Sequence, residues 1–218
     1  MHNGIIKFDA NYKNYTNKQR HNPQFTTQMK LKRAYYLQPD VVKLAKDLLG
    51  KVLVSKTGNF LTSGIITETE AYNGIIDKAS HAFGGRRTNR TEVMFAEGGI
   101  SYVYLCYGIH NLFNIVTNVK DIPHAVLIRA IQPLKGEKHI LQRRNAKALN
   151  KNLCVGPGKV TNALGINREH NALSLNGNII WLEDDNIKPK DILIGPRIGV
   201  DYAGEDAKLP YRFWVEKI

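Results

Sequence analysis

The stretch Gly64-Ile-Ile-Thr-Glu-Thr-Glu-Ala-Tyr72 is the most informative strand candidate in the chain. Alternate residues of a strand point to opposite faces of a sheet, so Glu68, Glu70 and Tyr72 share one face. Two carboxylates and an aromatic ring are unusual on a core face and common on a solvated one. An ionised glutamate can also act as a general base toward water, or supply oxygen ligands to a hard divalent ion. This strand therefore has three interpretations: a solvated face, a general base or a metal site.

The other strand candidates are short, rich in Ile, Val and Tyr, and separated by turn residues. Residues 39–50 are predicted to form an amphipathic helix, because Pro39 suits its first turn and Gly50 suits a left-handed C-cap. Two further helices are expected, a very polar one at 136–150 and one at 157–165. The strand candidates lie at 52–54, 100–107, 112–118, 124–131, 178–183 and 211–216.

These elements indicate the α+β class, because strands outnumber helices and do not alternate regularly with them. The sequence shows neither an internal repeat nor a linker after residue 34. We expect a single compact domain over residues 34–218, with a curved, mainly antiparallel or mixed sheet flanked by helices.

The composition limits the class of protein. The 218 residues include 31 Lys and Arg against 19 Asp and Glu, a formal net charge of +12. Two cysteines exclude a disulfide-built fold and fit a reducing compartment. No apolar run approaches the roughly 18–20 residues that span a bilayer, and we see no signal peptide. We expect a soluble intracellular protein whose charge favours nucleic acid, then an anionic membrane surface, or serves solubility alone.

Half of the net charge lies in residues 1–33, which contain seven basic residues and one acidic residue, Asp9. This segment has little hydrophobic periodicity. We predict a polar basic arm, loosely held or disordered, that precedes the single domain at 34–218. It either touches phosphates or is a terminus without a role.

A glycine-rich basic loop follows the acidic strand. Residues 77–90 contain Arg86, Arg87 and Arg90 beside two glycines, which suits the wrapping of a phosphate backbone. The spacing of a nucleotide P-loop is absent. Three tyrosines then occupy residues 100–107, as expected either for stacking on bases or for a buried aromatic strand. Together, the carboxylates, the arginines and the tyrosines suggest chemistry on a nucleic-acid base.

A metal site is not expected. The acids after the strand fall in loops without ligand-like spacing, and the histidines lack the paired spacing of zinc sites. The residues considered are Asp77, Glu92, Glu97, His81, His110 and His124.

Several ordered motifs resemble the 3-methyladenine (alkyladenine) DNA glycosylase family, the eukaryotic-type alkylpurine glycosylases that bacteria also carry. The resemblance spans residues 39–214. Its main motifs are Thr67-Glu-Thr-Glu-Ala-Tyr72 with Asp77 and His81, Arg90-x-x-x-Met94-Phe95, and Gly99-x-x-Tyr102-Val-Tyr104-x-x-Tyr107-Gly108 with Asn114.

The resemblance implies a monofunctional, metal-free and cofactor-free glycosylase. It would act as a monomer, without membrane association, on double-stranded DNA that contains damaged purines. Flipping the nucleotide out of the stack would expose the glycosidic bond, and hydrolysis would leave an abasic site. The implied location is the bacterial cytosol, with the DNA, or the nucleus in a eukaryote.

Individual roles follow from the same resemblance. It implies that Glu70 is the general base and that Arg129 lies near the attacking water and the backbone phosphate. The base would be sandwiched by Tyr72, His81 and Tyr104. The remaining implied roles are a DNA wedge at Tyr107, a pocket gate against the guanine amino group at Asn114, and an aliphatic support for the water at Ile198.

Residue chemistry adds further expectations. The arginines of the loop at 86, 87 and 90 would contact DNA, and Lys159 at a helix start would either hold a phosphate or be solvated. Alkylation at N3 or N7 makes a purine cationic, which suits a π-rich pocket and a single carboxylate. A neutral lesion would need an acid that the sequence does not reveal. The alternatives are a non-catalytic nucleic-acid binder and a glycosylase/lyase that uses Lys78 or Lys159.

Overall fold

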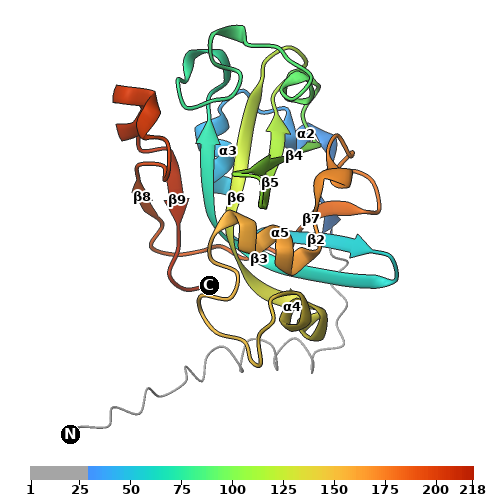
Figure 1. The fold of residues 1–218 in the computed structure, drawn as a ribbon. Helices are drawn as coiled ribbons and strands as arrows, with labels where there is room; N and C mark the ends of the chain where they lie inside the picture. Colours follow the sequence, from blue (N-terminus) through green and yellow to red (C-terminus); the bar gives the residue numbers. More distant parts are fainter. Residues whose placement is uncertain (1–28) are drawn as a thin grey trace, which may run out of the picture.

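A computed structural model describes residues 29–218, which form one curled antiparallel sheet with short helices around it (Figure 1). The strands are β1 Met29–Lys30, β2 Val52–Thr57, β3 Phe60–Tyr72, β4 Ile100–Cys106, β5 His110–Thr117, β6 His124–Lys135, β7 Ile180–Asp184, β8 Leu193–Gly195 and β9 Arg212–Trp214. The α-helices are α2 Arg33–Tyr36, α3 Val41–Asp47, α4 Glu137–Arg143 and α5 Pro157–Leu164. The 3-10 helices are η1 Gly74–Ile76, η2 Phe83–Gly85, η3 Glu92–Phe95, η4 Arg168–His170 and η5 Asp201–Lys208.

The strands follow the order β1-β7-β2-β3-β6-β5-β4 across the sheet. Strand β9 pairs with part of β3, and β8 pairs with β9, at the left of Figure 1. All the strand pairs of the described residues are antiparallel. The predicted α+β class and curved antiparallel sheet are therefore confirmed.

Each strand predicted from the sequence is present, and the predicted helices are shorter than expected. Helix α3 begins after Asp40, whose side chain accepts the Lys43 N–H at 2.9 Å, and the chain turns at Gly50 with a φ of 85°. Helix α4 ends at Arg143, and Asn145 then takes a left-handed φ of 48°. Beyond it, Ala146 and Leu149 still pack against the core, but the chain does not continue as a helix.

The two faces of strands β4, β5, β6 and β3 have opposite environments. One face joins the main hydrophobic core, to which α3 and α5 also contribute. The other face lines a cleft, and the period of two along each strand assigns every side chain to one or the other. The core residues of these strands are Ala71, Val103, Phe113, Ile115, Val126 and Ile128. The cleft residues are Tyr72, Tyr102, Tyr104, Leu112, Asn114, Leu127 and Arg129.

Strand register aligns one row of the cleft face. Glu70 is opposite Leu127, Leu127 is opposite Asn114, and Asn114 is opposite Tyr102. The β3–β6 pairing shifts register on both sides of Glu68, as in a β-bulge. The bulge adds local twist there, so both carboxylates of β3 approach the same side chain of β6.

The predicted arm at 1–33 falls mostly outside the described residues. Its last five residues lie inside them: Met29–Lys30 pair with β7 as strand β1, and Leu31 is buried in the core. This part of the segment therefore belongs to the folded body. Across residues 29–218, the helices are too short and too polar to traverse a lipid bilayer.

Candidate active site

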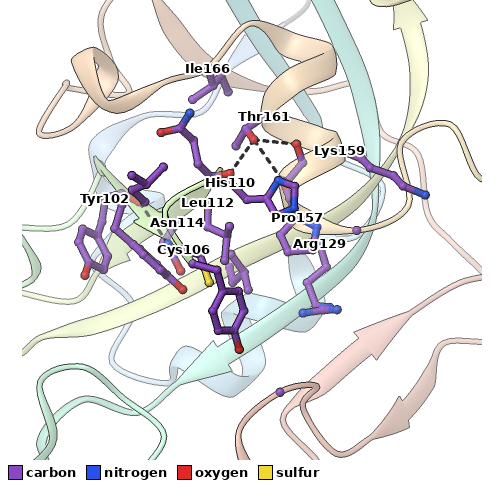
Figure 2. Close-up of a pocket in the computed structure, with 18 of the residues that line it drawn as sticks. Tyr102, Cys106, His110, Leu112, Asn114, Arg129, Pro157, Lys159, Thr161 and Ile166 are labelled. Atoms are coloured by element: carbon purple, nitrogen blue, oxygen red, sulfur yellow. Dashed lines mark hydrogen bonds between the residues drawn. The ribbon is translucent and has the colours of Figure 1, made fainter. Parts of the chain in front are cut away.

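The cleft is a cavity of about 1180 Å³ over the face of β4, β5 and β6, closed on one side by α5 (Figure 2). Loop residues 79–94 and 198–202 complete its wall. Helix α5 is fixed to β5 because Thr161 Oγ1 donates to the Asn111 carbonyl at 2.6 Å, one of the dashed lines in Figure 2. The cleft is therefore built on the rigid sheet, with loops supplying only part of its wall.

Glu70 lies behind this wall with no exposed surface. Its Oε2 accepts the Tyr72 hydroxyl at 2.8 Å, and its Oε1 accepts the Ile198 backbone N–H at 2.8 Å. Arg129 Nη1 lies 3.3 Å from the same Oε1. All three partners line the cleft, so the carboxylate is held at the boundary between the sheet and the cavity.

The electrostatic environment of Glu70 is balanced. Burial raises the pKa of this carboxyl above its ordinary value of 4.5. The Arg129 charge, the Ile198 N–H and the Tyr72 hydroxyl oppose the rise, whereas the nearby Glu68 charge adds to it. A carboxylate with a raised pKa is a stronger base than one in water, as proton abstraction from water requires.

Glu68 shares Arg129 with Glu70. Arg129 Nε donates to Glu68 Oε1 at 3.1 Å, and Arg212 Nη1 of β9 donates to the same oxygen at 3.3 Å. The prediction that the two glutamates share a face is confirmed. The solvated-face interpretation is wrong, because both glutamates are buried and pair with Arg129, and Glu68 also pairs with Arg212.

Aromatic rings form the wall next to Glu70. The ring centroids of His81 and Tyr104 are 4.7 Å apart with an interplanar angle of 75°, and those of Tyr102 and Tyr104 are 5.3 Å apart. His81 Nδ1 and the Tyr102 hydroxyl are 2.9 Å apart. Tyr72 stands on β3, and burial keeps its hydroxyl protonated by raising its pKa. The three residues expected to sandwich a base thus line one cavity.

Arg90 closes the rim of this pocket. Its guanidinium carbon lies 5.1 Å from the centroid of the Tyr104 ring, and its Nη2 lies 2.7 Å from His81 Nε2. Burial, followed by the charges of Arg90 and Arg86, lowers the pKa of His81 to about 4. His81 is therefore uncharged at neutral pH, and Arg90 supplies the positive charge at this rim.

Asn114 is buried on the cleft face of β5, and its Nδ2 donates to the Tyr102 carbonyl at 3.2 Å (Figure 2). The hydrogen bond fixes the amide orientation, and Leu127 flanks it on β6. Ile198 lies at the opposite wall, with half of its side chain exposed.

Tyr107 lies at the tip of the β4–β5 hairpin and is 87% exposed. It has a left-handed φ of 50°, and Gly108 follows with 73°. A non-glycine residue with positive φ is uncommon, so presenting this ring carries a local conformational cost. The neighbouring Ile109 is also exposed.

The loop arginines do not act as one cluster. Arg87 pairs with Glu92 and Asp121 at 2.8 and 3.1 Å, and it faces a second depression away from the cleft. Arg86 is exposed on the outside of the loop. Of the arginines expected to contact DNA, only Arg90 lines the cleft. Lys159 lines it as well, and its Nζ donates to the Asn152 carbonyl at 3.3 Å.

Sequence reasoning missed the pair Asp77 and Arg197, and it assigned Tyr102 no individual role. Arg197 lies next to Ile198, and its guanidinium packs beside Tyr72. Asp77 and Arg197 are 120 positions apart in the sequence, so no local pattern predicted that they meet. Within residues 29–218, no three His, Cys, Asp or Glu side chains gather as ligands for a metal ion.

Comparison with known proteins agrees with the resemblance in the sequence. The family described as methylpurine-DNA glycosylase (MPG) matches residues 35–218. A Chlamydia felis protein named "Putative 3-methyladenine DNA glycosylase" is 50% identical over 184 residues, which cover 84% of this chain and 94% of the relative. Proteins of the same name from Clostridium acetobutylicum and Bacillus thuringiensis are 43% and 45% identical, and the matches cover 86% and 83% of this chain and 95% and 93% of the relatives. The chain belongs to the methylpurine-DNA glycosylase family.

Proposed function

We propose that this chain is a monofunctional DNA glycosylase that releases alkylated purines, such as 3-methyladenine, from double-stranded DNA. The observation that carries the proposal is the Glu70 carboxylate, buried at the cleft wall and held by Tyr72, Ile198 and Arg129. Family membership and the names of the relatives support the same activity.

In the proposed reaction, Glu70 takes a proton from a water molecule that attacks C1′ of the damaged nucleotide. The bond between C1′ and the purine nitrogen breaks, its electron pair leaves with the base, and an abasic sugar remains. Glu70 Oε2 accepts one hydrogen bond and keeps lone-pair capacity for the water proton. Glu70 is buried directly behind Ile198, which is half-exposed in the cleft, so we propose that the water lies beside Ile198.

The aromatic wall would hold the flipped base. Stacking on aromatic side chains contributes about 1–3 kcal/mol per base, which offsets part of the cost of unstacking it from the duplex. Tyr72, His81 and Tyr104, which line the same cavity, would supply the stacking surfaces. Tyr107 would fill the gap that the base leaves in the duplex, since its exposed ring projects from a hairpin tip.

Specificity for alkylated purines follows from charge. N3- or N7-alkylation makes the purine a cation, and electron-rich ring faces attract cations. An uncharged His81 adds no second positive charge to that of Arg90, whose guanidinium lies 5.1 Å from the Tyr104 ring centroid. The Asn114 amide would exclude bases with a clashing exocyclic amino group, because the Tyr102 carbonyl fixes its orientation.

The non-catalytic binder is the less favoured alternative. Burying a carboxylate costs free energy. In a protein that only bound DNA, this negative charge would also repel the phosphates and would bring no benefit. The glycosylase/lyase is not favoured either, because Lys78 is exposed and Lys159 donates to a backbone carbonyl. We further propose that the protein acts as a monomer in the compartment that holds the DNA.

The test is base release from a methylated duplex. Purified protein should release 3-methyladenine without added metal, and an unmethylated duplex of the same sequence serves as the control. Binding of the duplex without release of any modified purine would contradict the proposal and favour the binder. Borohydride trapping of the protein on DNA would instead favour the lyase.

A further inference from the structure

A buried ion pair lies directly behind the proposed general base. Arg197 Nη1 and Nη2 donate to Asp77 Oδ2 and Oδ1 at 2.5 and 2.9 Å, and both side chains are at most 1% exposed. Asp77 also accepts the backbone N–H groups of Asn73 and Ala79, at 2.9 and 3.0 Å. The pair thus ties the loop after β3 to the segment that precedes Ile198.

Both hydrogen bonds that orient Glu70 come from groups next to Arg197. Ile198 follows it in the chain, and the Ile198 N–H bonds Glu70 Oε1. The Tyr72 ring centroid lies 4.9 Å from the guanidinium carbon, and the Tyr72 hydroxyl bonds Glu70 Oε2. Arg197 Nη1 also donates to the Ala71 carbonyl at 3.0 Å, between Glu70 and Tyr72 in the strand.

We infer that Arg197, locked by Asp77, is the positioning residue of the general base, because it fixes the two groups that orient the Glu70 carboxylate. The inference rests on the proposed role of Glu70. Arg197 touches no reacting atom. Its positioning effect passes through Ile198 and Tyr72, and its charge also attracts the Glu70 carboxylate directly.

A structural role alone explains this pair poorly. Removing two charges from water costs more than a buried pair commonly returns, and apolar residues of similar size often serve a fold equally well. Arg197 Nε is also buried without a hydrogen-bond partner among the described residues. The remaining guanidinium atoms bind Asp77, the Ala71 carbonyl and the Asp206 carbonyl, and the Ala71 contact lies directly between Glu70 and Tyr72 on β3.

The pH dependence of base release distinguishes a positioning role of the Asp77–Arg197 pair from a purely stabilising one. The charged and titratable groups near Glu70 are Arg129 of β6, Glu68 and Tyr72 of β3, Arg212 of β9 through Glu68, and Arg197 itself. Displacement of the Ile198 N–H removes a bond that lowers the Glu70 pKa. The pKa then rises further, so the ionised form appears only at higher pH.

The experiment measures single-turnover base release against pH in two variants. Arg197→Lys keeps the cation but cannot bind both Asp77 oxygens and the two carbonyls at once. The double variant Asp77→Asn/Arg197→Met removes both charges and leaves neither unpaired. Asp184→Asn is the matched control, because it breaks the 2.8 Å ion pair with Lys51 outside the cleft. Circular dichroism and thermal unfolding establish that each variant is folded.

We expect both pair variants to release base about 10–100-fold more slowly at neutral pH, the decrease expected from slight misplacement of a catalytic group. Their acid limb should move to higher pH, and the defect should shrink as pH rises. Asp184→Asn should keep the wild-type rate and profile. If only the double variant fails to fold, the rate and pH profile of Arg197→Lys alone test the inference.

A folded Arg197→Lys protein with the wild-type rate and pH profile would overturn the inference. A slower rate with an unchanged acid limb would also overturn it, because the defect would then not involve Glu70. Failure of the proposed function looks different: the wild-type protein releases no base, or Glu70→Gln remains active.

Discussion

Among individual residues, Glu70 determines the expected pH dependence. Burial raises its pKa above 4.5, and only the ionised form can accept a proton from water. The rate of base release should therefore fall as pH decreases through a midpoint above 4.5. His81 should add no transition near pH 6.5, because its pKa is about 4. Single-turnover rates across pH 4–8, corrected for spontaneous depurination, measure the midpoint. A midpoint at or below 4.5 would contradict a Glu70 pKa that is raised by burial.

Tyr104 provides a test of the base pocket. Tyr104→Ala should weaken binding of a duplex with an alkylated purine by about 1–3 kcal/mol, since one stacking surface is removed. Tyr104→Phe is the matched control, because it keeps the ring and removes only the hydroxyl. Equilibrium titration in a Glu70→Gln background measures affinity without turnover. Equal affinities of the Ala and Phe variants would show that the base does not stack there.

Residue faces could be predicted from the sequence, whereas distant partners could not. The period of two in β3 correctly placed Glu68, Glu70 and Tyr72 together. Burial of the two glutamates depends on Arg129 and Arg212, which arrive from other strands. The Asp77–Arg197 ion pair joins two loops and leaves no local periodicity. Contacts between residues far apart in the sequence depend on the tertiary fold. A sequence motif can therefore indicate important residues without showing which of them are in contact.

Among the elements, the β4–β5 hairpin carries the expected DNA wedge. Tyr107→Ala should slow base release and weaken binding of a damaged duplex, while thermal stability stays unchanged because the ring is almost fully exposed. Ile194→Ala on β8 is the control, since it removes an exposed apolar side chain outside the cleft. If Tyr107→Ala released base and bound the damaged duplex as the wild type does, the hairpin tip would not be part of the DNA interface.

The register shift between β3 and β6 is a second test at this scale. A Cβ added at Gly64 would meet Ile131 Cδ1 at 2.7 Å and the Gln132 carbonyl oxygen at 2.9 Å. Gly64→Ala should therefore lower the free energy of unfolding by about 1–3 kcal/mol, as overpacking commonly does. Urea denaturation measures the change, and undiminished stability would show that the strands can separate locally at no cost.

Strand positions were well predicted because apolar alternation and turn residues are local signals. The arginine loop was less predictable. Its sequence suggested one phosphate-binding cluster, but Arg87 is held by Glu92 and Asp121, whereas Arg90 turns into the cleft. Spacing in an irregular loop does not determine the direction of long side chains, because no fixed period relates position to face.

At the scale of the whole molecule, the net charge of +12 predicts salt-dependent DNA binding. Residues 1–28 contain four Lys and Arg against one acid, and one of the two interpretations of the arm places them on DNA phosphates. Deletion of residues 2–28 should weaken binding of undamaged duplex and reduce the salt slope by about 0.9 for each phosphate that the arm neutralises. The single-turnover rate at saturation should not change. Unaltered affinity and slope would leave the segment without a DNA-binding role.

The general-base role of Glu70 is tested most directly by single-turnover release of 3-methyladenine by Glu70→Gln, with duplex affinity measured in parallel. The amide keeps the shape of the carboxylate but cannot accept the water proton. Glu183→Gln, on β7 of the same sheet and outside the cleft, is the control. We expect the rate to fall by at least about 10²–10⁴-fold, the usual contribution of a general base, while affinity and the Glu183→Gln rate stay near wild type. Release by Glu70→Gln at the wild-type rate would contradict the proposed mechanism.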